Sequence, residues 1–142
     1  MNNTPTRSLQ RLRLVLRANA AFSALTGTAA LIAGSWVSRR LGIDNMALTR
    51  ALGVGLLGFA AAAVAIARAD ERRLLRDSLL VSLADAGWVL GTILVVSTGI
   101  LTPTGNIVAA LIAIGVADFG AAQFGFRSRA MHDGAGLRTA TV

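Results

Sequence analysis

Two aspartates, Asp85 and Asp118, lie inside apolar stretches of the chain, where a carboxyl group needs an explanation. A charged side chain at membrane depth costs about 2.5–3.5 kcal/mol on insertion scales, so it normally faces the interior of a helix bundle and marks a functional site. Asp85 lies six residues after Leu79, and Asp118 lies nine residues before Arg127. At the helical rise these offsets are about 9 and 13 Å. We therefore expect both carboxyls at similar depth on neighbouring antiparallel helices.

Arg17 and Asn19 complete the predicted intramembrane polar cluster with the two aspartates. Asn19 takes a matching depth in the first apolar stretch, and Arg17 lies two residues closer to the surface. Arg17 either pairs with a carboxylate or extends to the lipid headgroups. Gln123, five residues after Asp118, is expected to point elsewhere, and Trp88 is interpreted as a packing residue.

The sequence leaves two interpretations of this cluster open. The first is structural, because polar contacts between membrane helices contribute about 0.6–2 kcal/mol each and fix how the helices pack. The second is a working site, which is the default hypothesis for ionisable groups at membrane depth.

The residues needed for catalysis or cofactor binding do not accompany the cluster. The chain has no cysteine, and its single histidine, His132, lies in the polar tail, so we expect no metal site and no haem. The glycines lie inside apolar stretches rather than between a strand and a helix, so they do not form a phosphate-binding loop. We expect a protein that is not an enzyme and that uses no cofactor.

Four apolar stretches must position the cluster, and they cover residues 18–37, 48–67, 78–101 and 104–126. Crossing the hydrocarbon core of a bilayer takes about 20 such residues. Only 15% of the 142 residues are charged, against about 25% in soluble domains. The sequence predicts an all-α integral membrane protein: a four-helix transmembrane domain over residues 9–128, a disordered N-terminus over 1–8 and a flexible tail over 129–142.

The residues just before the first stretch have an amphipathic pattern. Leu9, Leu12 and Leu16 share one helix face, and Arg7 and Arg11 lie opposite. This pattern predicts a lead-in helix that lies on the membrane surface.

Polar residues predict where the later helices begin. Asp44 lies shortly before the second stretch and Asp77 directly before the third, so both are candidate N-cap residues. Residues 102–106 form a short uncharged turn, so the third and fourth stretches are expected to form a helical hairpin.

The arginines predict the orientation in the membrane. All fourteen basic residues are arginine: four precede the first stretch, four lie between the second and third, and three follow the fourth. Only three lie at the connection of the first and second stretches: Arg39, Arg40 and, at the start of the second stretch, Arg50. Because basic residues accumulate on the cytoplasmic side and meet anionic headgroups there, we expect a multi-pass inner-membrane protein with both termini cytoplasmic. No nucleic-acid-binding motif is present, so nucleic acid is not an expected partner.

The two halves of the chain resemble each other. Residues 18–22 (ANAAF) align with residues 84–88 (ADAGW), and residues 55–62 (GLLGFAAA) align with residues 115–122 (GVADFGAA). This predicts a 2+2 parallel internal repeat about an axis along the membrane normal. Chance similarity between segments rich in alanine and glycine is the alternative.

Four glycines are candidates for close helix packing. Gly87 and Gly91 form a GxxxG motif, and Gly53 and Gly58 lie in the second stretch. Small residues let membrane helices approach each other closely, within one chain or between chains.

The arginine-rich start, the segment LRANAAFSAL at 16–25 and the segment ADAGWVLG at 84–91 give the chain a family likeness. Over residues 10–128 it resembles small four-span bacterial inner-membrane proteins of unknown function. The resemblance implies no activity.

The residues favour a non-enzymatic membrane protein that acts through association, with itself as a homo-oligomer or as an accessory subunit of a larger membrane complex. The alternative is a proton-linked small-molecule carrier or channel that uses Asp85 and Asp118.

Overall fold

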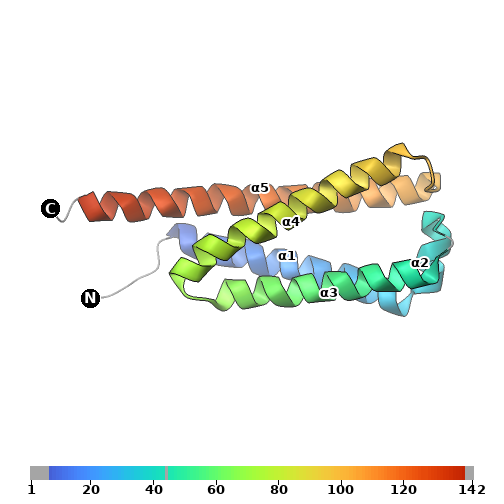
Figure 1. The fold of residues 1–142 in the computed structure, drawn as a ribbon, viewed down its shortest axis with the longest axis horizontal. Coiled ribbons are helices and arrows are strands. Elements are labelled where there is room, and N and C mark those ends of the chain that lie inside the picture. Colours follow the sequence, from blue (N-terminus) through green and yellow to red (C-terminus); the bar gives the residue numbers. More distant parts are fainter. Residues whose placement is uncertain (1–6, 44, 140–142) are drawn as a thin grey trace.

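The computed structural model of the protein describes residues 7–43 and 45–139, of which residues 134–139 are described by their backbone alone. The described chain forms five helices in the order α1 (Arg7–Ile32), α2 (Gly34–Leu41), α3 (Met46–Arg68), α4 (Glu71–Ser97) and α5 (Pro103–Thr139) (Figure 1). Four of them, α1, α3, α4 and α5, are long and apolar enough to cross a membrane. The prediction of a helical protein with four helices of this length is confirmed.

The long helices alternate in direction and pack as two pairs. α1 packs most extensively on α3, and α4 packs most extensively on α5. α1 also packs along α5 and so joins the two pairs. α4 starts beside the end of α3, then crosses the bundle diagonally toward the start of α5, so that α3 and α4 separate along their length (Figure 1).

The first apolar stretch is not one continuous helix. α1 ends at Ile32, Ala33 leaves the helical conformation, and the short helix α2 starts at Gly34. Gly34 is followed by Ser35, and such Gly/Ser pairs are common sites of sharp helix kinks. α2 ends at Gly42, whose φ of 80° lies in the left-handed region that glycine adopts without a penalty.

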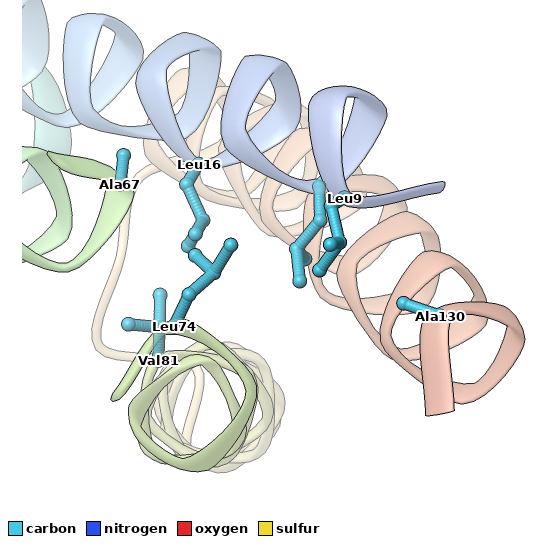
Figure 2. Packing of buried hydrophobic residues seen from close by; sticks show 7 residues of the cluster. Leu9, Leu16, Ala67, Leu74, Val81 and Ala130 are labelled. Carbon is cyan, nitrogen blue, oxygen red and sulfur yellow. The ribbon is translucent and has the colours of Figure 1, made fainter. Parts of the chain in front are cut away.

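The predicted separate lead-in helix is wrong, because residues 7–17 continue directly into the apolar part of α1. Leu9, Leu12 and Leu16 are buried inside the bundle. They form the leucine core together with residues from three other helices: Ala67, Leu74, Val81 and Ala130 (Figure 2). The amphipathic pattern is real, but its apolar face packs on protein. Arg7 and Ser8, expected to be disordered, lie in α1, and residues 1–6 lie outside the described part.

α5 does not end at residue 126 and runs on to Thr139. At the helical rise its 37 residues span about 55 Å, well beyond the roughly 30 Å of a hydrocarbon core. The described part of the expected flexible tail is therefore helical, and residues 140–142 lie outside it. α1 supports this extension, since Ser8 Oγ donates to Asp133 Oδ2 at 2.8 Å and Arg11 lies 5.9 Å from the Phe126 ring centre.

Two helix starts differ from the prediction. The side chain of Asn45 caps α3 by accepting the Leu48 N–H at 3.0 Å, and Asp44 lies outside the described residues. Asp70 caps α4 by accepting the Arg73 N–H, and this hydrogen bond lowers the pKa of Asp70 below its usual value. Asp77 is not a cap, because α4 begins six residues earlier.

Candidate functional site

A buried carboxyl joins three helices near the middle of the bundle. Asp85 of α4 is 3% exposed, and its Oδ2 accepts two hydrogen bonds. Asn19 Nδ2 of α1 donates at 2.8 Å and Gln123 Nε2 of α5 donates at 3.1 Å. Both amide side chains are completely buried. The structure thus brings together Asn19 and Asp85, two of the four residues of the predicted cluster.

The expectation that Gln123 points elsewhere is wrong. Its amide oxygen also lies 3.4 Å from the Ser82 hydroxyl, which donates to it, so Gln123 links two positions of α4. In the structure Val116, Gln123 and Ala130 recur at intervals of seven residues and all three are buried. Residues seven apart share a helix face, so Gln123 lies on the inward face of α5. The sequence carries no clear signal for this, because apolar residues also flank Asp118 at the same spacing.

Asp118 does not join the site. Its side chain is exposed, and it has no hydrogen bond or ion pair with any side chain of the described residues. Asp118 and Gln123 are five residues apart, which places them about 140° apart around the helix. Since Gln123 faces Asp85, Asp118 must face away from it. The residue of α5 that packs on Asp85 is Gly120, where an added Cβ would lie 3.4 Å from the Asp85 Cβ.

Arg17 does not join the site either. It is exposed, and it precedes the buried Asn19 by two residues, or about 200° around α1. Inward orientation of Asn19 therefore turns Arg17 outward. Asp85 consequently has no ion pair with a basic side chain among the residues that the structure describes.

A cavity of about 360 Å³ lies beside Asp85. Helices α1, α3, α4 and α5 all contribute to its walls, and the polar residues among them are Ser23, Asp85 and Trp88. Asp85 Oδ1 makes no hydrogen bond to the described part of the chain, since both amides reach Oδ2. Trp88 Nε1 and Asn19 Oδ1 are buried and equally lack a partner there. The site thus holds a donor and two acceptors that no described residue satisfies.

The four glycines expected at helix contacts divide into two groups. Gly53 of α3 packs against α1, where an added Cβ would lie 2.9 Å from the Gly27 carbonyl oxygen. Gly58, Gly87 and Gly91 face open space, with no atom within 4 Å of an added Cβ. Gly27 of α1, which was not predicted to take part in helix packing, is the partner of Gly53 in this contact.

The site combines a buried carboxyl with a largely apolar cavity. Over the described residues, no group of three or more His, Cys, Asp or Glu side chains is placed to hold a metal ion. Two neutral amides fix one oxygen of the Asp85 carboxyl and leave the other without a hydrogen bond to the described residues, and Asp85 lines the cavity. Comparisons with protein-family models, with curated proteins and with solved structures find no match to this chain.

Proposed function

We propose that the protein is a non-enzymatic, multi-pass protein of the inner membrane that acts through association between copies of this chain. The observation that carries this proposal is the exposed carboxyl of Asp118, which lies in the apolar part of α5 without a partner among the described residues. Ionisable residues within membrane spans face protein or a water-filled cavity rather than lipid. A contact with a second chain would bury the Asp118 carboxyl, which a single chain leaves exposed.

A second copy fits this face because a carboxylic acid both donates and accepts hydrogen bonds. Two Asp118 side chains that meet across a two-fold axis therefore satisfy each other, as an isologous interface requires. Leu111, Ile114 and Ala121 lie on the same side of α5 and are exposed. Ala121 is small enough to allow close approach of two helices beside the carboxyl pair.

Orientation and duplication complete the proposal. The one end of the bundle that carries eleven of the fourteen arginines faces the cytoplasm. The two halves arose by duplication of a helical hairpin. The pairing of α1 with α3 and of α4 with α5 supports this view, as does the meeting of Asn19 with Asp85, which are equivalent residues in the alignment.

Counting molecules in liposomes tests the association. Labelled protein is reconstituted over a range of protein-to-lipid ratios, and the copies in each particle are counted from photobleaching steps. We expect dimers that dissociate on dilution, and about tenfold weaker association for Asp118→Leu, because each interhelical hydrogen bond contributes about 0.6–2 kcal/mol.

Two variants control this measurement. Asp118→Asn keeps a side chain that both donates and accepts, so it should still associate. Leu25→Ala, an exposed change on α1, should leave association unchanged. A protein that is monomeric at every dilution, or an Asp118→Leu variant that dimerises as well as the original, contradicts the proposal.

The carrier alternative rested on Asp85 and Asp118 acting together. In the structure Asp85 of α4 contacts the side of α5 that carries Gln123, whereas Asp118 lies on another, exposed side of α5. A carrier would therefore have to use Asp85 alone. Asp85 does line a cavity.

A further inference from the structure

The negative charge of Asp85 has no counterion among the described residues. Its two hydrogen-bond donors are the neutral amides of Asn19 and Gln123. An unpaired carboxylate in an apolar interior is costly, and a cation is the group that compensates it best. Because Oδ1 is left without a hydrogen bond, it is the atom that an outside cation would contact.

The cavity beside Asp85 has room for an organic molecule. Its volume of about 360 Å³ falls in the usual range of roughly 300–1,000 Å³ for ligand sites. Apart from Asp85, Trp88 and Ser23, its walls are apolar or glycine: Leu48, Ala51, Leu52, Gly55, Leu56, Phe59, Ala84 and Val116. A mostly apolar cavity with a few polar groups at one place selects a ligand with an apolar body and a single polar head.

The position of the cavity determines how a ligand reaches it. The walls from α3 come from residues 48–59 and those from α4 from residues 84–88. These segments lie away from the loop that joins α3 to α4, where the two helices diverge from each other (Figure 1). Because α3 and α4 both line the cavity, we expect a ligand to enter between them from the hydrocarbon of a membrane and to be soluble there.

Trp88 identifies the head group further. It lines the same cavity. Tryptophan is the aromatic side chain that attracts cations most strongly through its ring face. No arginine lines the cavity, so a phosphate would bring a second negative charge beside Asp85 with nothing to offset it.

We propose that this cavity binds a hydrophobic amine in its cationic form, with the ammonium group on Asp85 Oδ1 beside Trp88 and the apolar tail between α3 and α4. The ligand carries no phosphate, which sets it apart from amine-containing phospholipids. The proposal does not rest on self-association, since Asp118 takes no part in the site.

Tryptophan fluorescence measures the binding directly. The Trp36→Phe variant leaves Trp88 as the sole tryptophan and removes a residue of α2 that lies outside the cavity. This variant is placed in phosphatidylcholine nanodiscs and titrated with decylamine, and separately with decanol as an uncharged probe of equal chain length. We expect a saturable response to decylamine and at least tenfold weaker binding of decanol.

Substitutions in the same background locate the site. Asp85→Asn should weaken decylamine binding at least tenfold, to the level of decanol. Gly55→Leu keeps Asp85 and fills the cavity, since nothing lies within 4 Å of a Cβ at this position, and it should abolish the response. Gly91→Leu also enters open space, but outside the cavity, and should bind decylamine normally.

Three results overturn the proposal. Equal saturable binding of decylamine and decanol shows a site for neutral amphiphiles. A response that does not saturate, or that survives Gly55→Leu, shows partition into the lipid alone. Weaker decylamine binding in nanodiscs that contain phosphatidylethanolamine shows that a phospholipid headgroup occupies the site.

Discussion

Asp85 shows how a single residue can be held firmly without a charged partner. Two buried amides converge on one carboxyl oxygen, and the hydroxyl of Ser82 steadies one of them. The three helices that meet here are far apart in sequence, so this small network fixes their relative positions at one depth. The two hydrogen bonds to Oδ2 also fix the orientation of the carboxyl group, and therefore the position of Oδ1.

The first prediction at this scale concerns Gln123. Gln123→Met keeps the volume and removes the hydrogen bonds, so it should lower the free energy of unfolding by about 0.6–2 kcal/mol. This loss is measured by unfolding the protein, purified in a mild detergent, with increasing amounts of a denaturing detergent. Asn19→Leu should show a similar loss, and the double variant should lose less than the sum, because both amides serve the same oxygen.

Ser82→Ala is the control for this comparison. The Ser82 hydroxyl also lies 3.2 Å from the Ser78 carbonyl oxygen within α4, so its loss should cost less than the loss of Gln123. Strictly additive losses from Asn19→Leu and Gln123→Met are incompatible with a shared acceptor.

The sequence predicted part of this site for clear reasons. The depth of Asn19 and of Asp85 follows from counting residues along apolar stretches, and the two do meet. The depth of Asp118 and Arg17 does not determine which side of its helix each residue occupies. It depends on which side of each helix the neighbours cover, and the buried positions of α5, which recur every seven residues, place Gln123 inward and Asp118 outward.

At the scale of the helices, the apolar stretches predict where the helices lie, whereas packing and side-chain caps determine where they begin and end. Hydropathy ends where arginines begin, yet α1 and α5 both continue past that point because their apolar faces pack on each other and on α4. The break at Ala33 was not predicted from the apolar run, although the Gly34–Ser35 pair that follows it is a common kink site. Side-chain caps at Asn45 and Asp70 set the starts of α3 and α4.

Gly53 and Gly58 provide a matched prediction on α3. Gly53→Ala should destabilise the protein by about 1–3 kcal/mol, because overpacking forces the helices apart. The new methyl group would lie 2.9 Å from both the Gly27 carbonyl oxygen and Leu31 Cγ. Gly58→Ala meets no atom within 4 Å, so it should be neutral or stabilising by about 0.5–1 kcal/mol through helix propensity. Thermal unfolding of both variants in detergent compares them.

Reconstituted membranes extend this comparison. If Gly58→Ala weakens association in liposomes while it leaves unfolding in detergent unchanged, the open face of α3 takes part in a contact between chains. If Gly53→Ala proves harmless, α1 and α3 do not approach each other as closely as the structure shows.

At the scale of the whole molecule, the bundle is polarised. The starts of α1 and α4 and the ends of α3 and α5 gather at one end (Figure 1), where most of the arginines lie. Two of these arginines turn inward to helix carbonyls: Arg13 Nη1 donates to the Ala67 oxygen at 2.6 Å and Arg127 Nε to the Leu75 oxygen at 2.7 Å. The arginines of this end thus stabilise the bundle as well as set its proposed orientation.

Labelling of single cysteines tests this orientation, and the chain offers a clean background because it has no cysteine. Glu71→Cys, at the arginine-rich end, should be protected from a membrane-impermeant thiol reagent in intact cells and should react after the cells are opened. Met46→Cys and Thr104→Cys, both exposed at the opposite end, should react in intact cells. The reverse pattern would place the termini outside.

The leucine core has a consequence for the order in which the chain is assembled. Leu9, Leu12 and Leu16 leave the ribosome before the residues that cover them, which lie between positions 67 and 130. While the remainder is being synthesised, these leucines have no cover of their own, and exposed apolar surface of this kind invites wrong contacts. α1 is therefore synthesised before the other described helices, and its surroundings are completed only when α5 packs against it at the arginine-rich end.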